Sequence, residues 1–405
     1  MSSVPTPARR VVILLCCAEA LSMAGFGAYP AFLPMLRETW QMTGSEAGFI
    51  GGAFFFGYML AVPLLSGVTD RVDARAVFVC SCLLAAAGTA GFAWYASDVV
   101  SGALWQALAG AGLAGSYMPG LKALADRIAG QVEERRQARY IAFYTATFGI
   151  GTSASLLGAG WLGGMLDWRP AVALLATGPV AAAAIAFFGL RAMAPHGAAS
   201  APWLPNFPRV LAEPALRPYL AGYAVHCWEL FGLRSWLVAF IAFAFASAAG
   251  AATAPLLTPA EAAALINLVG LPASILGNEA AAGIGRKRWI TGIMAASGLL
   301  CWLAGFAAAW PWWLMLAILA IYFAVIMADS AALTAGMIAA TPLDQRGAAM
   351  ALYSFLGFGA GFISPLAFGA ALDLGRGEAL GWTLAFGTLG FGCLVWALRA
   401  RRSGV

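Results

Sequence analysis

Residues 219–246 read YLAGYAVHCWELFGLRSWLVAFIAFAFA, an apolar run long enough to cross a bilayer as one helix. Three ionisable side chains interrupt this run, those of His226, Glu229 and Arg234. A charged side chain at the centre of a bilayer costs about 2.5 to 3.5 kcal/mol even on a lenient insertion scale. We therefore expect these three residues to face a water-filled cavity or polar partners instead of lipid.

The rest of the chain has the same apolar character. Of its 405 residues, 62% are hydrophobic and 10% are charged, and the mean hydropathy is +0.82. An average soluble domain has about 25% charged residues. The apolar runs are continuous, which favours helices over the alternating strands of a barrel. The sequence thus predicts an all-α polytopic membrane protein. Its twelve predicted spans are residues 11–36, 46–66, 76–97, 99–122, 139–165, 169–190, 218–246, 260–282, 289–309, 312–340, 346–371 and 381–399.

The positive charges predict how the spans are oriented. If both termini are cytoplasmic, all but four of the 23 Lys and Arg residues lie in inner loops or tails. Arg37, Arg169 and Arg376 lie outside, and Arg234 lies within the seventh span. This asymmetry predicts a multi-pass protein of the inner membrane with both termini in the cytoplasm. The net charge of +5 is then a topology signal, and we expect no nucleic-acid partner.

The chain divides into two similar halves. The proline-rich residues 191–217 form the longest polar connection, so we predict six-span domains at 1–190 and 218–405, joined by a cytoplasmic linker at 191–217. A shift of 210 residues superposes Cys17-Ala18-Glu19 on Cys227-Trp228-Glu229 and Gly67 on Gly277, and residues 163–167 match 369–373 at a slightly shorter shift. Several matches in the same order indicate an internal duplication.

One loop carries a resemblance to a known family. Between the second and third spans the sequence runs Gly67-Val68-Thr69-Asp70-Arg71-Val72-Asp73-Ala74-Arg75. It resembles the cytoplasmic loop signature of the major facilitator superfamily, Gly-x-x-x-Asp-Arg-x-Gly-Arg-Arg, although Asp70 and Arg71 come one residue early. With twelve spans and two halves, the resemblance covers essentially the whole chain. It implies two pseudo-symmetric six-helix bundles that rock around a site near the midplane.

The resemblance also implies a cytoplasmic gate. In this family the loop Asp pairs with a basic group at the end of the fourth helix and with the N-terminus of the eleventh, which latches the outward-open state. Asp70 would take that role, with Lys122 or Arg127 as its cation. Alternatively, these charges only keep the helix ends out of the lipid. The predicted gate residues are Gly67, Asp70, Arg71, Arg75, Lys122 and Arg127.

Other family motifs are incomplete. Of the fourth-helix motif Arg-x-x-Gln-Gly-x-Gly, which is linked to proton coupling, Gln106 remains but the arginine position is Ala103. The fifth-helix exporter motif Gly-Pro-x-x-Gly-Gly is approached by residues 159–164, without its proline. These departures weaken a drug/proton antiporter as the function. Pro119-Gly120 and Ser364-Pro365 are candidate helix breaks near the substrate path.

The candidate site consists of ionisable residues at membrane depth. Glu19, Glu229 and Asp329 fall on the first, seventh and tenth spans, which the resemblance places around the central cavity. Buried carboxylates of this kind can carry protons when their access to water changes. Glu19 and Glu229 correspond in the two halves, so we expect them to face one cavity and to serve the shared transport step. Glu19, Ser22 and Met23 share one helix face.

His226 and Arg234 have no counterpart in the first half and are therefore candidates for substrate choice. His226 and Glu229 are neighbours at i and i+3, and Arg234 lies about 80 degrees around the helix from His226, at about 100 degrees per residue. All three can therefore border one cavity. Arg234 either binds an anionic substrate or neutralises Glu229, and His226 and Asp329 could instead be satisfied packing residues. Secondary cavity candidates are Gln106, Tyr117, Tyr144 and Tyr353.

These observations predict a secondary active transporter of a small organic solute, with alternating access and proton coupling. No Gly-x-x-x-x-Gly-Lys-Ser/Thr motif is present, so an ion gradient is favoured over ATP hydrolysis. We expect no enzyme activity, no cofactor and a monomer. The alternatives are an uncoupled facilitator, a multidrug/proton antiporter, a membrane receptor that does not transport, and a metal-ion transporter using Cys17, Met23, His226 and Cys227. Import and export are both open.

Overall fold

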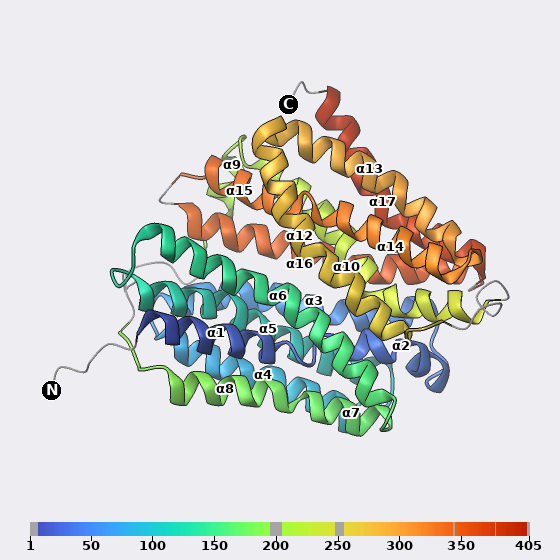
Figure 1. Cartoon of the computed structure of the whole chain (residues 1–405), viewed down its shortest axis with the longest axis horizontal. Coiled ribbons are helices and arrows are strands. Elements are labelled where there is room, and N and C mark those ends of the chain that lie inside the picture. The colour runs from blue at the N-terminus through green and yellow to red at the C-terminus, as the bar shows by residue number, and fades with distance from the viewer. Residues whose placement is uncertain (1–6, 195–204, 248–254, 343–344, 377, 403–405) are drawn as a thin grey trace.

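The computed structural model describes residues 7–194, 205–247, 255–342, 345–376 and 378–402 of the chain. Within these ranges the regular elements are helices and no strand occurs, as predicted. The helices lie side by side, with the N-terminal half in blue to green on one side of the bundle and the C-terminal half in yellow to red on the other (Figure 1). Residues 195–204 of the predicted linker lie outside the described ranges.

The first half contains eight helical segments. They are α1 (Ala8–Ser22), α2 (Ala28–Thr39), α3 (Gly44–Thr69), α4 (Ala74–Tyr95), α5 (Val99–Ile128), α6 (Glu134–Gly163), α7 (Trp168–Leu175) and α8 (Thr177–Gly189). The segments of the rest of the chain are α9 (Phe207–Ala212), α10 (Arg217–Ala246), α12 (Pro259–Ile284), α13 (Arg286–Phe306), η1 (Ala307–Ala309), α14 (Trp312–Met327), α15 (Ser330–Ala340), α16 (Arg346–Leu374) and α17 (Ala379–Arg402).

Among the described residues, nine helical stretches are long and apolar enough to cross a membrane, and three of them join two successive segments, α7 with α8, α13 with η1 and α14 with α15. The three remaining predicted spans correspond to α1 with α2, to α5 and to α6. The last two have 30 residues each, but glycine and hydroxyl side chains lower their hydropathy. Because each span reverses the chain, α1 begins and α17 ends at the same face of the bundle. We call this the terminal face, and the other end the opposite face.

Three spans are interrupted: the sixth only at Ala176, between α7 and α8, and the first and tenth at breaks that a neighbouring helix stabilises. The first span is interrupted between α1 and α2, where the Gly27 N–H donates to Ser155 Oγ at 2.7 Å and that hydroxyl donates to Ala24 O. The tenth span breaks at Ala328 and Asp329, and Ala328 O accepts from Trp289 Nε1 at 2.9 Å. These contacts satisfy backbone groups that a bilayer cannot.

The two candidate proline breaks are not breaks in the structure. Pro119 lies inside the continuous helix α5 and Pro365 inside α16. Around Pro365, Ser364 Oγ donates to Trp228 O at 2.5 Å, and Pro365 O accepts from Trp236 Nε1 at 3.0 Å. Both contacts join α16 to α10 beside Pro365.

The two halves meet most closely along α3 and α16, towards the opposite face. Gly44, Gly48 and Gly52 repeat every fourth residue and place the α3 backbone directly against α16. A Cβ at Gly48 would lie 2.1 Å from Pro365 O, and a Cβ at Gly52 would lie 2.2 Å from Phe362 O. Such small-residue contacts let helices approach closely without a hydrophobic driving force. The α2–α10 and α6–α12 contacts complete the junction between the halves.

Within the first half, Gly57 is expected to be sensitive to the smallest substitution. Its Cβ would lie 1.8 Å from Ala107 O in α5, so Gly57→Ala must push two helices apart. We expect a loss of about 1 to 3 kcal/mol in unfolding free energy. Gly149→Ala in α6 is the control, because its Cβ meets nothing within 4 Å. Thermal unfolding in detergent would measure both variants, and equal melting temperatures would contradict the expectation.

Candidate functional site

A large cavity between the halves opens at the terminal face. It has a volume of about 640 Å³, within the range of about 300 to 1,000 Å³ that is typical of ligand pockets. Its walls come from the terminal-face ends of α3, α5 and α16 and from α9. Among the lining residues are Val62, Asp70, Met118, Lys122, Asn206 and Ser354. We call it the terminal cavity.

A layer of stacked aromatic rings lies deeper along α3. The Phe55 and Phe231 ring centroids are 4.3 Å apart, and those of Tyr58 and Phe358 are 3.6 Å apart. Phe231 also stacks on Phe358 at 5.1 Å. The rings come from α3, α10 and α16, so they join the two halves. Along α3 this aromatic layer lies between Val62, which lines the terminal cavity, and Gly51 and Phe54, which line a second cavity.

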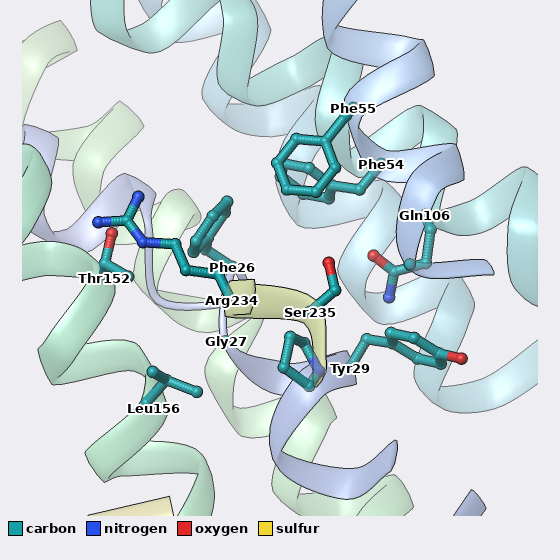
Figure 2. Close-up of a pocket in the computed structure, with 12 residues that line it drawn as sticks. Phe26, Gly27, Tyr29, Phe54, Phe55, Gln106, Thr152, Leu156, Arg234 and Ser235 are labelled. Carbon is teal, nitrogen blue, oxygen red and sulfur yellow. The ribbon is translucent and has the colours of Figure 1, made fainter. Parts of the chain in front are cut away.

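The second cavity, here the inner cavity, is small and partly polar. Its volume of about 20 Å³ is enough for one water molecule. Figure 2 shows Arg234 reaching along it towards Thr152, with Ser235, Tyr29 and Gln106 on the other side of the Arg234 side chain. The complete lining is Phe26, Gly27, Tyr29, Pro30, Gly51, Phe54, Phe55, Gln106, Thr152, Leu156, Arg234 and Ser235. Every lining element except α10 belongs to the first half.

Arg234 is buried and held in place by a neutral side chain. Its Nε donates to Asn267 Oδ1 at 2.9 Å, and Asn267 Nδ2 donates to Ala263 O at 2.9 Å, which orients the amide. The guanidinium carbon lies 5.6 Å from the Phe323 ring centroid. Among the described residues, no carboxylate oxygen lies within 4.0 Å of the guanidinium, so Arg234 and Glu229 form no ion pair here. The positive charge remains available to a ligand.

Glu19 lies at the centre of a hydroxyl cluster in the first half. Its Oε2 accepts from Tyr144 OH at 3.0 Å and from Ser22 Oγ at 3.5 Å. Ser22 Oγ is also 2.8 Å from Glu19 O and 3.2 Å from Ser116 Oγ. The side chain of Glu19 is fully buried, and its Oε1 has no hydrogen-bond partner within the described part of the chain. Tyr117 stacks on Tyr144 and borders this cluster.

Glu229 occupies an equivalent but separate cluster in the second half. Ser297 Oγ donates to its carboxylate, Tyr322 OH donates to Oε1 at 2.8 Å, and Cys393 Sγ donates to Oε2 at 3.2 Å. These partners come from α13, α14 and α17. The structure therefore encloses each glutamate within its own half, and neither Glu19 nor Glu229 lines the terminal or inner cavity. We expected Glu19 and Glu229 to face one shared cavity. In the structure they do not, because hydroxyl groups of each bundle bind the carboxylate of that bundle.

His226 and Asp329 form a third buried group. His226 Nδ1 lies 2.8 Å from Asp329 Oδ1, within ion-pair distance, although the ring N–H is not aligned for a hydrogen bond. Tyr223 stacks on His226 and, at 3.6 Å between centroids, on Tyr353. Tyr353 OH is 3.1 Å from Thr334 Oγ1. Of His226, Glu229 and Arg234, only Arg234 lines the inner cavity, which corrects the expectation that all three border one cavity.

The cysteines do not assemble a metal site. All seven are free thiols, and Cys17 is exposed while Cys227 is buried. Across the residues that the structure describes, no group of three or more His, Cys, Asp or Glu side chains could hold a metal ion. The Cys17, Met23, His226 and Cys227 combination considered above is therefore not brought together as a site. Met23 instead packs beside Gly151 of α6.

Comparison with known proteins decides the family. A family model described as Major Facilitator Superfamily matches residues 15–277, more than half of the chain. The chain belongs to the major facilitator superfamily. It is therefore a multi-pass membrane protein of a transporter family, and the predicted fold of twelve transmembrane helices in two six-helix bundles is confirmed.

Solved structures of major facilitator proteins share this fold. A bacterial homolog of the human lysosomal transporter Spinster, inward-facing and occupied, has a TM-score of 0.72 and 15% identity, with 98% of each chain covered. Its unoccupied form has a TM-score of 0.71 and 15% identity, over 97% of this chain and 95% of that one. A mutant of the nucleoside transporter NupG has a TM-score of 0.76 and 12% identity, over 97% and 99%. A search of curated proteins gives no match.

The loop that resembles the major facilitator signature contacts the end of α5. Lys122 Nζ lies 4.0 Å from Asp70 Oδ1 and 3.5 Å from Asp126 Oδ2. Arg127 instead pairs with Asp73, with Nη2 3.1 Å from Oδ1. Of the two candidate cations, Lys122 is thus the one beside Asp70. Gly67, Asp70 and Lys122 all line the terminal cavity.

The two other arginines of this loop bind backbone carbonyl groups. Arg71 Nη1 donates to Gly67 O at 3.1 Å. Arg75 donates to Ala186 O at 3.2 Å and to Phe187 O at 2.6 Å, which joins the start of α4 to the end of α8. Both side chains therefore brace helix ends of the first half at the terminal face.

Asp73 is expected to stabilise the terminal face in a pH-dependent manner. Burial alone would raise the pKa of its carboxyl, but the N–H groups of Arg75 and Met193 and the Arg127 guanidinium hold the pKa below its usual value. A depressed folded pKa gives stability that is present above the unfolded pKa of about 3.9 and is lost as pH falls through the folded pKa. We expect Asp73→Asn to lower the melting temperature at neutral pH.

The difference between Asp73→Asn and the wild type should shrink on acidification from about pH 6 to pH 3. Thermal unfolding in detergent at several pH values measures it. Asp70→Asn serves as the control, because the Asp70 side chain is exposed and, within the described ranges, its ion pair is the 4.0 Å contact with Lys122. A melting temperature of Asp73→Asn equal to that of the wild type at neutral pH would contradict this expectation.

Proposed function

We propose that this protein is a proton-coupled secondary active transporter that moves a small organic anion by alternating access. The observation that carries the proposal is Arg234, a buried cation that lies at a cavity between the halves and has no carboxylate partner among the described residues. Leaving a buried charge unpaired is costly, so a site of this kind is best explained by a ligand that brings the opposite charge. The bidentate fork of an arginine suits a carboxylate or phosphate group.

Alternating access is supported by the arrangement of the cavities. The terminal cavity is open between the halves, whereas α3 and α16 are in backbone contact towards the opposite face. Because positive charges concentrate at the terminal face, we infer that this face is cytoplasmic and that the structure is inward-open at the inner membrane. Residues 1–190 and 218–405 would then move as two bodies joined by residues 191–217, in a monomer.

Substrate binding would require the aromatic layer to open. The inner cavity has room for about one water molecule, and the Phe55–Phe231 stack lies between it and the terminal cavity. Separation of α3 from α10 would enlarge the inner cavity and connect it with the terminal cavity. Arg234 would then bind the anionic group, and Gln106 and Thr152 would offer hydrogen bonds to the rest of the molecule.

Proton coupling is supported by the two enclosed glutamates. Neither Glu19 nor Glu229 has a cationic side chain within 4.0 Å among the described residues, and both are surrounded by hydroxyl groups. The neutral acid is the form that fits such a site, since an uncompensated charge at this depth is costly. Rearrangement of the hydroxyl partners during rocking would admit water and release the proton. His226 and Asp329 are the second candidates for proton transfer.

The proposal is tested with purified protein in liposomes that contain a pH-sensitive dye. Organic anions are compared with neutral analogues of equal size. We expect anion uptake that is accompanied by proton movement and that is driven by an imposed pH gradient. Anion flux without proton movement would indicate an uncoupled facilitator. Flux of the neutral analogues alone would reject an anionic substrate.

A further inference from the structure

One carboxylate joins the two halves at the opposite face. Asp373 lies near the end of α16 and contacts the first turn of α3. The N–H groups of Gly44 and Ser45 donate to Asp373 at 2.6 Å and 2.8 Å, and Ser45 Oγ donates at 2.8 Å. The donors belong to the first half of the chain and the acceptor to the second. None of the predicted site residues takes part in this contact.

The contact satisfies backbone groups that α3 cannot satisfy alone. The first N–H groups of a helix have no acceptor within it, and the helix dipole favours a negative charge there. Thr43 and Glu46 form a capping box that serves the N–H groups of Thr43 and Glu46 themselves. The N–H groups of Gly44 and Ser45 are left for Asp373. The Asp373 carboxylate belongs to the second half, and it therefore binds the positive N-terminal end of α3, which belongs to the first half.

Glycine at two positions makes this approach possible. A Cβ at Gly44 would lie 2.4 Å from Gly369 O, and a Cβ at Gly369 would lie 1.9 Å from Gly44 O. Only the absence of both side chains lets the start of α3 and the end of α16 come together. The three hydrogen bonds form in this closed arrangement and must break when the halves separate at the opposite face.

We infer that Asp373 is a latch that holds the opposite face closed and stabilises the conformation that is open at the terminal face. This inference rests on the alternating access of the proposed function and is independent of the substrate and of protons. At the other end of the same helix pair, Asp70 caps the C-terminus of α3 and lines the terminal cavity together with Gln345, which precedes α16. Each helix thus carries an Asp at its C-terminal end, and among the described residues the Asp373 carboxylate binds the N-terminus of the partner helix whereas Asp70 lies beside Lys122 of its own half.

The chain contains a matched control for this latch. Residues 163–167 correspond to 369–373 in the duplicated sequence, which makes Asp167 the counterpart of Asp373. Asp167 is exposed, and its side chain makes no cap hydrogen bond to the helix that follows it. At the start of α12, Thr258 and Glu261 form the local capping box. Within the described structure, Asp373 of α16 thus binds the start of α3, whereas its counterpart Asp167 forms no equivalent contact with the start of α12.

Hydrogen exchange of the full-length protein in nanodiscs, without substrate, tests the latch. In Asp373→Ala we expect amides of residues 44–53 to exchange about tenfold faster, because charge-assisted hydrogen bonds to the first turn are lost. We also expect amides of residues 348–354, which border the terminal cavity, to exchange more slowly, because the population shifts to the state in which that cavity closes. Ser45→Ala, which removes one of three donors, should give a smaller change with the same signs.

Two results would overturn the latch. Faster exchange at residues 44–53 without slower exchange at 348–354 would make Asp373 a local cap only. The same pattern in Asp167→Ala as in Asp373→Ala would assign the change to a general loss of charge. If Asp373→Ala does not fold, Asp373→Asn, which keeps one acceptor oxygen, is measured in its place. Liposome flux that persists while the latch test fails would leave the proposed function intact.

Discussion

Arg234→Ala is expected to reduce anion uptake at least about a hundredfold, because a charge-assisted contact to the substrate is lost at a buried site. Arg234→Lys should keep part of the activity, since it retains the charge but not the planar fork that binds two oxygens. The measurement is initial uptake of a labelled anion into liposomes at several concentrations. Equal activity of the Ala and Lys variants would remove Arg234 from the substrate site.

Asn267→Asp offers a sharper form of the same test. The Asn267 amide already accepts the Arg234 Nε hydrogen bond at 2.9 Å, so the substitution places a carboxylate of the same shape beside the guanidinium. The internal ion pair would then compete with the anionic substrate, and we expect uptake to fall although Arg234 is unchanged. Uptake equal to that of the wild type would show that the charge of Arg234 is not the feature the substrate recognises.

Glu229→Gln and Glu19→Gln are expected to abolish proton movement while the protein still exchanges substrate. Glutamine keeps the shape of the side chain, and its oxygen can still accept from Tyr322 at Glu229 or from Tyr144 at Glu19. It cannot bind and release a proton at physiological pH. Uptake driven by a pH gradient should therefore fall at least about tenfold, whereas exchange of internal for external substrate, which needs no net proton transfer, should continue.

Glu46→Gln is the control for the two glutamates. Glu46 is an exposed capping residue at the start of α3, so its substitution should leave proton movement unchanged. Monodisperse elution and an unchanged melting temperature would show that each variant is folded. Unchanged proton movement in both Glu19→Gln and Glu229→Gln would reject these residues as proton carriers.

The membrane fold and the family were predictable from the sequence because the information is local. A run such as residues 219–246 predicts a span by its length and hydropathy alone, and the loop from Gly67 to Arg75 carries a recognisable signature. The cost of charge in a bilayer likewise made Glu19, Glu229 and Arg234 visible as special residues. The breaks at residues 23–27 and at Asp329 were not predictable, because the groups that stabilise them, Ser155 and Trp289, lie on other helices.

The partners of the ionisable residues were missed for a physical reason. Ser297, Tyr322, Cys393 and Asn267 are uncharged at neutral pH, so they stand out less in a hydropathy pattern than Glu229 and Arg234 do. They become significant only because α10, α12, α13, α14 and α17 pack around Glu229 and Arg234. The sequence by itself determined that costly charges enter the bilayer. The tertiary structure decided that each glutamate is enclosed by hydroxyl groups of its own half and that Arg234 has no counter-charge among the described residues. It also decided that Asp373 joins the halves. Such contacts depend on helices that are far apart in the chain, so the sequence alone does not show them.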